Sequence, residues 1–208
     1  AEETASEAEL KGPTWIVDPL DGTVNFAHQL QHVAVSVGLW HEEAVQLGVV
    51  VLPMLGESFT AVRGQGAWLN NTPIQTTSTT DLDHALIATG FPYNILEKLD
   101  QVLPCLEAVL SRCRGVRRLG AAAVDLAYTA CGRLDGFYEL GLKPWDTAAG
   151  WLLVEEAGGS VIRFGDSRPY DLFSETILAT NGPLESKLLD VLDMALPGHH
   201  IESQRGNA

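Results

Sequence analysis

Alternation of apolar and polar residues predicts a series of strands in the first third of the chain. Residues 33–40 (VAVSVGLW) and 46–53 (QLGVVVLP) are rich in β-branched residues and flank a polar turn, which is typical of a hairpin. Residues 57–62 and 67–69 continue this pattern between turns at Gly64 and Asn70. The apolar run at 15–17 (WIV) indicates one more short strand. We therefore predict an antiparallel sheet that the 15–17 strand joins.

The pattern changes after a polar, threonine-rich stretch at residues 73–84. Leucines then recur at helical spacing from position 96 to position 110, with Pro104 as a kink or restart. Helices are also expected at 120–132, 147–157 and 183–196, and strands at 85–89, 134–139, 160–164 and 176–180. Interleaved strands and helices predict an α/β or α+β fold with a mixed sheet. The predicted organisation is an N-terminal sheet subdomain at 1–80, a C-terminal α/β subdomain at 81–196 and a polar tail at 197–208.

Candidate chemistry lies where the 15–17 strand ends. Asp18 follows the apolar run, and Pro19 disfavours helical backbone there, so we expect the strand to end in a carboxylate. Asp21 is a favourable N-cap for a short helical turn, and the N–H groups of Gly22 and Thr23 would suit a phosphate. Carboxylates beside phosphate commonly hold Mg²⁺. Asp-Pro and Asp-Gly are also common turn dipeptides, so DGTV alone favours a turn, whereas the whole string favours a metal site.

Two further polar features each allow a structural and a functional interpretation. Asp146 stands directly before the helix expected at 147–157, where a carboxylate serves equally well as an N-cap or as a metal ligand. Four arginines crowd into seven residues, at positions 112, 114, 117 and 118. They fit either a docking patch for RNA or another acidic partner, or a solvated helix end and edge strand. The acidic net charge favours the second interpretation.

Composition narrows the class of protein. The 208 residues are 46% hydrophobic and 19% charged, which is enough to bury a sizeable core. No run approaches the roughly 18 apolar residues of a membrane span, and no secretory leader is visible, so we expect a cytoplasmic protein. Three cysteines without a CxxC predict reduced thiols. The net charge of −14 argues against nucleic-acid or anionic-membrane binding, and an anionic substrate then requires metal ions that reverse the local charge.

Two long motifs about 125 residues apart carry a family resemblance. They are DPLDGTVNF at residues 18–26 and PWDTAAG at 144–150, which runs on to EAGG at 156–159; AEET at 1–4 is a third, shorter piece. In this order they resemble the signatures of the inositol monophosphatase family, in its bacterial type. The resemblance implies a layered αβαβα sandwich shared with sugar-phosphate phosphatases, a homodimer, and a family segment ahead of residue 1 that this chain lacks.

The resemblance also implies a Mg²⁺-dependent phosphomonoesterase that hydrolyses inositol monophosphate, or a similar small polyol phosphate, by direct attack of a metal-activated water. Glu2 and the hydroxyl of Thr23 would orient that water, and lithium would inhibit the enzyme. The implied metal ligands are Glu2, Asp18, the backbone carbonyl of Leu20, Asp21 and Asp146, with Asp18 bridging two ions. The implied substrate-binding residues are Asp21, Gly22, Thr23, Gly120, Ala121, Ala122 and Glu139.

The chain departs from the family pattern in places that bear on substrate preference. Ala121 stands where the family carries Thr, and Ala1 stands where it carries Gly. From position alone, a solvated acid is the favoured interpretation of Glu2, and only the resemblance gives this residue a role. The structural alternative for Glu139 is an ordinary strand-end acid. Two alternatives therefore stay open: a fructose-1,6-bisphosphatase or nucleotide 3′-phosphatase of the same superfamily, and a non-catalytic interaction protein that docks through the cluster at 112–118.

Overall fold

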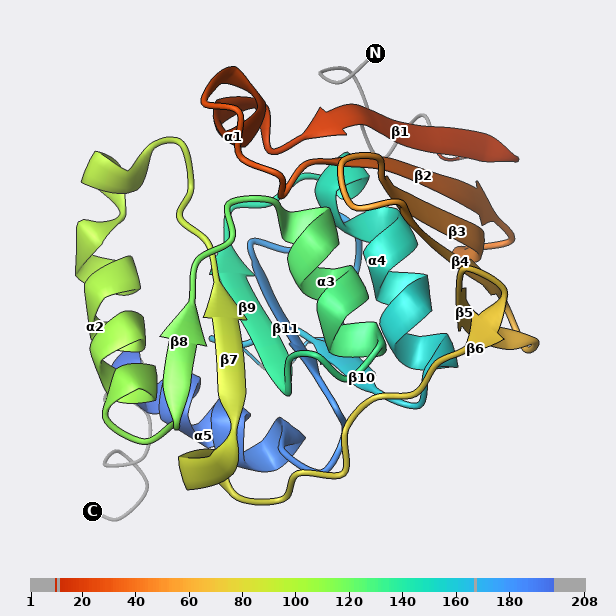
Figure 1. Cartoon of the computed structure of the whole chain (residues 1–208). Coiled ribbons are helices and arrows are strands. Elements are labelled where there is room, and N and C mark those ends of the chain that lie inside the picture. The colour runs from red at the N-terminus through yellow and green to blue at the C-terminus, as the bar shows by residue number, and fades with distance from the viewer. Residues whose placement is uncertain (1–9, 11, 167, 197–208) are drawn as a thin grey trace.

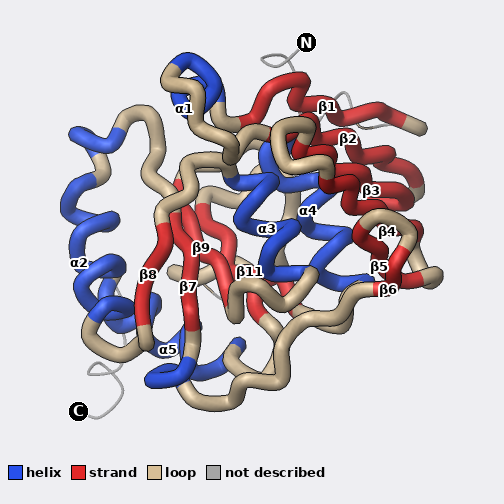
Figure 2. Tube along the Cα trace, viewed as in Figure 1, coloured by secondary structure: helices blue, strands red, loops and turns tan. Residues whose placement is uncertain are grey.

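The computed structural model describes residues 10, 12–166 and 168–196, so Glu2 and the AEET segment lie outside the described residues. Within that part of the chain, two β-sheets alternate with two layers of helices (Figures 1 and 2). This arrangement confirms the predicted layered α/β class. None of the described helices combines the length and the apolar character that crossing a membrane requires.

The first sheet is an antiparallel meander in chain order, as predicted. Its strands are β1 (Thr14–Asp21), β2 (Ala34–His41), β3 (Ala44–Leu52), β4 (Glu57–Val62), β5 (Gly66–Leu69) and β6 (Thr72–Pro73). Alternate residues such as Val50, Leu52 and Phe59 are fully buried, because one face of the sheet packs on a helix. Gly48 permits this close packing, since a Cβ there would lie 2.7 Å from the carbonyl oxygen of Ala149.

The second sheet is mixed, in the order β10-β11-β9-β7-β8. Its strands are β7 (Leu86–Thr89), β8 (Gly115–Arg117), β9 (Gly136–Leu140), β10 (Ser160–Ile162) and β11 (Thr176–Thr180). Strand β7 runs parallel to both neighbours, whereas β9, β11 and β10 pair antiparallel. Arg117 ends the edge strand β8, which agrees with the interpretation of that arginine as part of an edge strand.

Helices fill the space between the sheets and cover the outer face of the second sheet (Figure 1). Helices α3 (Ala122–Ala130) and α4 (Pro144–Glu156) lie between the sheets, and α2 (Leu99–Leu110) and α5 (Glu185–Ala195) lie on the outer face. The short helix α1 (Thr23–Ala27) lies apart from both layers, after the end of β1, and 3₁₀ turns occur at Leu82–His84 and Ile95–Glu97. Neighbouring residues of β9 face the two layers: Phe137 belongs to the core around α3 and α4, and Tyr138 to the core under α2 and α5. Pro104 lies inside α2 without ending it.

Helix α4 joins the two halves of the chain, because it packs against β1, β2, β3 and β4 although it follows β9 in sequence. Because this helix of the C-terminal part packs on the N-terminal sheet, the structure does not test the predicted subdomain boundary near residue 80, which stays a prediction. Three predicted helices have different bounds in the structure. The helix expected at 120–132 is Ala122–Ala130, the one expected at 147–157 is Pro144–Glu156, and the one expected at 183–196 is Glu185–Ala195.

Candidate metal and substrate site

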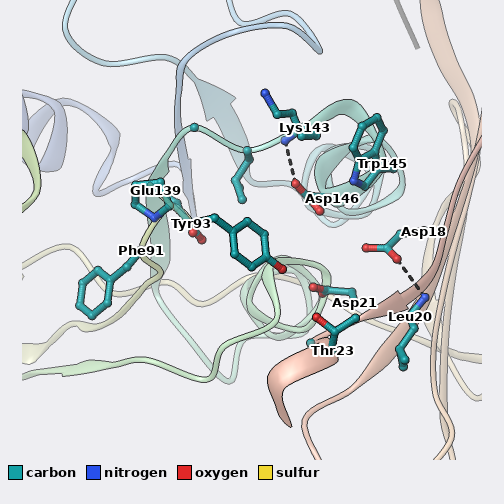
Figure 3. A pocket seen from close by; sticks show the side chains of 14 residues that line it. Asp18, Leu20, Asp21, Thr23, Phe91, Tyr93, Glu139, Lys143, Trp145 and Asp146 are labelled. Atoms are coloured by element: carbon teal, nitrogen blue, oxygen red, sulfur yellow. Dashed lines mark hydrogen bonds between the residues drawn. The ribbon is translucent and has the colours of Figure 1, made fainter. Parts of the chain in front are cut away.

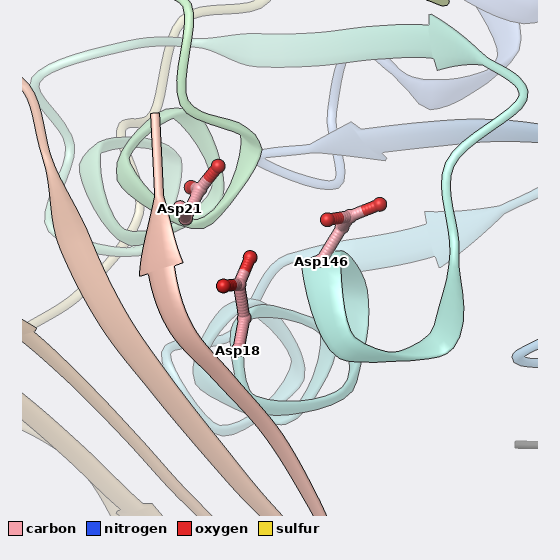
Figure 4. Close-up of side chains that lie close together, drawn as sticks. All are labelled: Asp18, Asp21 and Asp146. Atoms are coloured by element: carbon pink, nitrogen blue, oxygen red, sulfur yellow. The ribbon is translucent and has the colours of Figure 1, made fainter. Parts of the chain in front are cut away.

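Strand β1 carries two of the predicted ligands. The strand was expected to end at Asp18, but it runs on to Asp21 with a break in register. Asp18 pairs with Ser36 and Asp21 with Ala34, so three steps along β1 match two along β2, which is a one-residue bulge. Residues three apart in a regular strand face opposite sides of the sheet. The extra residue removes that mismatch, and both carboxylates point toward the same space (Figure 4).

Backbone N–H groups fix the positions of both carboxylates. Asp18 Oδ1 accepts a hydrogen bond from the N–H of Leu20 at 2.9 Å, and Asp21 Oδ2 accepts one from the N–H of Ala123 at 2.8 Å. The prediction that Asp21 caps the following helix is wrong. Gly22 is the N-cap of α1, in the left-handed region at φ 82°, and no side chain caps this helix. Asp21 instead ties β1 to the first turn of α3.

Asp146 reaches the same space from α4. Its predicted place as N-cap is wrong, because the helix begins at Pro144 and Lys143 is the N-cap. Asp146 lies in the first turn, where its Oδ2 accepts a hydrogen bond from the N–H of Lys143 at 2.7 Å. The three carboxylates of Asp18, Asp21 and Asp146 each place one oxygen within 4.8 Å of the others (Figure 4). The metal-binding alternative for Asp146 therefore has the geometry it needs.

Burial and mutual repulsion raise the pKa values of this cluster. Burial is the main cause for Asp21, whose pKa rises to about 7, with repulsion from Asp146 and Asp18 adding to it against the hydrogen bond from Ala123. Burial likewise raises the pKa of Asp146 to about 6, against the hydrogen bond from Lys143. A cation placed among the three carboxylates would relieve this repulsion. The donor set contains only oxygen, which suits a hard divalent cation such as Mg²⁺.

The cluster opens into a cavity of about 530 Å³ (Figure 3). Gly22, Thr23 and Leu20 line it on the β1 side and Glu139 lines it on the β9 side. An adjoining space of about 320 Å³ shares Asp21, Thr23, Glu139 and Asp146 with the first. The predicted substrate-binding residues Gly120, Ala121 and Ala122 line this adjoining space. The structure thus brings together every predicted site residue that lies within the described part of the chain.

Glu139 occupies a confined position on β9. Its side chain is buried, and a Cβ on Gly90 would overlap its carboxylate. Burial, with repulsion from Asp146 second, raises the pKa of Glu139 to about 8, while Arg118 opposes the shift. Asp125 of α3 is buried nearby, with no hydrogen-bond partner for either oxygen among the described residues. Burial, then repulsion from Glu139, raises the pKa of Asp125 well above its usual range.

Sequence reasoning missed several residues at this site. Phe91, Tyr93 and Arg118 line the cavity, and Asn25 holds its wall together by donating from Nδ2 to the carbonyls of His32 at 2.7 Å and Leu119 at 2.8 Å. The sequence gives Arg118 the same interpretation as the other three arginines of its cluster. Only its position two residues before Gly120, in the predicted substrate-binding turn, indicates that it lies near the cavity.

Comparisons with known proteins agree with this geometry. The profile of the inositol monophosphatase family matches residues 1–195. An inositol-1-monophosphatase of Synechocystis sp. is 45% identical over 193 residues, which cover 92% of this chain and 67% of that protein. The Nus factor SuhB of Escherichia coli (strain K12) is 41% identical over 194 residues, which cover 91% and 73% of the two chains.

A solved structure of the same family has the same fold. The inositol monophosphatase from Anabaena (Nostoc) sp. PCC 7120 superposes with a TM-score of 0.87 at 41% sequence identity, covering 93% of this chain and 78% of that one. The family profile, the sequence identities and the superposed fold therefore agree. The chain belongs to the inositol monophosphatase family.

Proposed function

We propose that the protein is a Mg²⁺-dependent phosphomonoesterase that hydrolyses inositol monophosphate or a similar small polyol phosphate. Membership of the family supports a phosphatase. One observation carries the proposal further: the Asp18–Asp21–Asp146 cluster opens into a cavity that also contains Glu139. A cluster of acids that admits a phosphate ester must hold cations, and a carboxylate deeper in the cavity suits the hydroxyls of a polyol.

The proposed ligands of the cation are the three clustered aspartates and the backbone carbonyl of Leu20. Leu20 lines the cavity and its N–H orients Asp18, so this residue belongs to the same wall. Glu2, the remaining ligand implied by the family, lies outside the described residues and stays a prediction. Bound Mg²⁺ would lower the pKa of a coordinated water and would screen the negative charge of the phosphate.

The other proposed roles belong to side chains and backbone of the cavity wall. Gly22 and Thr23 form the start of α1, where N–H groups lack helical partners and are suited to phosphate oxygens. The Thr23 hydroxyl is the proposed group that orients the attacking water. Glu139 would accept hydrogen bonds from adjacent hydroxyls of the polyol, and the turn at Gly120 and Ala121 would face the same part of the substrate.

The test is a panel of phosphate esters assayed with and without Mg²⁺, on the wild type and on Asp146→Asn. We expect hydrolysis of inositol monophosphate only with Mg²⁺, and a loss of at least roughly a thousandfold in Asp146→Asn, because a ligand to the cation contributes several kcal/mol to the transition state. Calorimetry should show weakened Mg²⁺ binding to the same variant. Asp83→Asn, at an exposed carboxylate away from the cavity, is the matched control.

Two results would contradict the proposal. Activity at the wild-type rate in Asp146→Asn would show that the site is wrong. A strong preference in the panel for fructose 1,6-bisphosphate or a nucleotide 3′-phosphate over inositol monophosphate would favour the alternative activities of the superfamily. Inhibition by lithium is expected from the family and belongs in the same assay.

The homodimer implied by the family stays a prediction, as does the cytoplasmic location. Leu96, Leu103 and Leu110 expose more than half of their surface along α2 and the turn before it, which is apolar surface of the kind that subunit interfaces bury. Size-exclusion chromatography with light scattering measures the oligomeric state directly. A monomer at all concentrations would contradict the prediction.

A second candidate function is docking of an acidic partner. Arg112, Arg114 and Arg117 are exposed, and no carboxylate pairs with them within the described ranges. The name of the E. coli relative, Nus factor SuhB, is the other observation that favours such a role. Replacing these three arginines by Gln should leave phosphatase activity intact, and an unchanged phenotype in the host would reject the docking role. Arg118 is not part of that surface alone, because it also lines the cavity.

A further inference from the structure

Asp125 is a buried acid to which the proposed mechanism gives no role. It lies in the first turn of α3 with 1% of its surface exposed, and neither carboxyl oxygen has a hydrogen-bond partner in the part of the chain that the structure describes. It does not cap the helix, because Ala121 is the N-cap and no side chain bonds to the first turn. A buried polar group without a partner costs stability and calls for an explanation.

Asp125 lies one helical turn behind the wall of the cavity. Ala121 and Ala122, four and three positions before it, line the polyol end, whereas Asp125 does not line the cavity. On β9, Phe137 packs into the core around α3 and α4. Glu139 follows two residues later on this strand, so its side chain leaves the sheet toward the same layer of helices. Asp125 and Glu139 therefore share one layer, the first behind the cavity wall and the second at it.

The surroundings of Asp125 favour its neutral form. After burial, Glu139 raises the pKa of Asp125 most, Asp21 raises it further, and Arg118 opposes the shift. The Arg118 side chain is exposed, and its guanidinium carbon lies 5.6 Å from the centre of the Phe91 ring in a cation–π contact. One exposed cation does not offset burial together with two acids, so Asp125 keeps its proton at neutral pH. A carboxyl group that keeps its proton can donate a hydrogen bond.

Glu139 lacks the support that the other acids of the site have. Asp18, Asp21 and Asp146 each accept a hydrogen bond from a backbone N–H, whereas no described donor bonds to the carboxylate of Glu139. Gly90 leaves room for this carboxylate but does not hold it. An acceptor for adjacent hydroxyls of a polyol binds more tightly when its orientation is fixed beforehand, because ordering a free side chain costs affinity.

We propose that Asp125 is a positioning residue for Glu139, which it orients toward the hydroxyls of the polyol by donating a hydrogen bond to the Glu139 carboxylate from behind the cavity wall. This inference rests on the proposed phosphatase function and adds the group that orients its polyol acceptor. The two side chains are not hydrogen-bonded as they stand, so the bond forms through one bound water or by a rotation of Glu139. The pair then holds one proton and one negative charge, and Glu139 keeps lone pairs for the substrate.

The alternative is a purely structural role for Asp125, in which a carboxylate near the start of α3 interacts with the helix dipole. The two roles differ in their dependence on substrate. Loss of a structural group affects all esters alike, whereas loss of a group that acts through Glu139 affects only esters with hydroxyls to bind. Contacts made equally in ground and transition states change KM and leave kcat in place, so the positioning role predicts a change in KM.

The experiment measures kcat and KM at saturating Mg²⁺ for inositol 1-phosphate and for p-nitrophenyl phosphate, which has no hydroxyl group for Glu139. Asp125→Leu replaces the two carboxyl oxygens by methyl groups, Asp125→Ala removes them, and Asp125→Asn keeps a hydrogen-bond donor. Thr129→Val is the matched control, because it removes a buried hydroxyl of α3 one turn further from the cavity.

We expect the KM for inositol 1-phosphate to rise at least about tenfold in Asp125→Leu and Asp125→Ala, because a hydrogen bond to a charged acceptor is lost. The kcat for this ester, and both constants for p-nitrophenyl phosphate, should stay within about twofold of the wild type. Asp125→Asn should raise the KM less than about threefold, and Thr129→Val should match the wild type. Infrared spectra at pH 7 should show the C=O stretch of a protonated carboxyl group in the wild type that Asp125→Asn lacks.

The outcomes separate this inference from the proposed function. Equal effects on both esters, an unchanged KM in the Leu and Ala variants, or no protonated carboxyl band would overturn the positioning role. Should the wild type not hydrolyse inositol 1-phosphate, the proposed function fails, and calorimetric binding of that ester then decides. There, about tenfold weaker binding to Asp125→Ala with unchanged binding to Asp125→Asn supports the role, and any other pattern overturns it. Thermal melting establishes which variants are folded, and either the Leu or the Ala variant suffices.

Discussion

The two ends of the cavity are built in different ways. The acidic end consists of Asp18, Asp21 and Asp146, which are placed by strand β1 and helix α4 and are held by backbone N–H groups. The polyol end is closed by the loop after β7, where Tyr93 is 95% exposed, and by the exposed Arg118. A rigid framework suits groups that must hold cations at fixed distances, whereas a loop tolerates change. The reaction type should therefore depend on the acidic end and substrate choice on the other.

Glu139 is the residue in which the two ends meet. It lies on a central strand and is buried like Asp18 and Asp21, but the room for its carboxylate comes from Gly90, at the start of the exposed loop. Its raised pKa depends on both sides, since burial and Asp146 raise it and Arg118 lowers it. Variants around Glu139 are therefore the most direct way to test whether the two ends act separately.

Among the variants that test whether the two ends act separately, the largest effect is expected from Gly90→Ala. The new Cβ would overlap the carboxylate of Glu139 and force that side chain to move, while the aspartate cluster keeps its own hydrogen bonds. We expect kcat/KM for inositol monophosphate to fall about 100-fold, or about 2.7 kcal/mol, with Mg²⁺ affinity unchanged within twofold. Steady-state kinetics and calorimetry measure the two quantities. Gly12→Ala is the control, because no atom lies within 4 Å of a Cβ there.

An equal loss of Mg²⁺ affinity and activity in Gly90→Ala would show that the ends are coupled, and the comparison would then fail. Wild-type kinetics in this variant would show instead that Glu139 does not contact the substrate. Either result is distinguishable from unfolding by the thermal melting curve of the variant.

A smaller effect is expected in the dependence of stability on pH without metal. The folded-state pKa values of Asp21, Asp146 and Glu139 are raised to about 7, 6 and 8, from ordinary values of 3.8, 3.8 and 4.5. The folded state therefore binds these protons more tightly than the unfolded state does. Their contribution is fully present below about pH 4 and is lost as pH rises through the folded-state values.

Metal-free protein should thus lose stability between pH 5 and pH 8.5, by at least about 2 kcal/mol, which corresponds to a fall in Tm of roughly 4–8 °C for a chain of this size. Added Mg²⁺ should restore stability at the alkaline end, because cation binding to the ionised acids favours the folded state. Calorimetric melting with EDTA and with Mg²⁺ checks both statements. A Tm in EDTA that rises over this range would contradict the assignment of the buried acids.

The acidic end was more accessible to sequence reasoning than the polyol end. Asp18, Asp21 and Asp146 lie in long motifs, and the strand before Asp18 is visible as an apolar run. The same motifs do not predict the backbone geometry that positions these three carboxylates. The bulge in β1 depends on pairing with Ser36 and Ala34, and the bond from Ala123 to Asp21 joins residues about a hundred positions apart. Tertiary contacts of this kind override the local capping preferences on which the predictions rested.

The polyol end shows why the rest could not be predicted. Arg118 has three neighbouring arginines in sequence, and nothing in their spacing separates the one that faces the cavity from those that face solvent. The contact with Phe91 decides it, and that contact depends on β7 and β8 lying side by side in the second sheet. The strand order of a mixed sheet is a property of the whole fold, so the position of Arg118 follows from topology rather than from local pattern.

The smallest effect is expected from Asn25→Ala, which acts between the two ends. Its amide holds the start of α1 against the turn before α3 through the carbonyls of His32 and Leu119. Removing it leaves two part-buried carbonyls without this donor, at a cost of about 1 kcal/mol in stability. Because α1 carries Thr23 and the turn carries Gly120, both phosphate and polyol contacts should loosen, and kcat/KM should fall a few-fold for every ester. Asn94→Ala, at an exposed amide that bonds only to Glu97 among the described residues, is the control. A loss confined to one class of ester would show that Asn25 supports only one end, which would favour separate rather than shared positioning of the two.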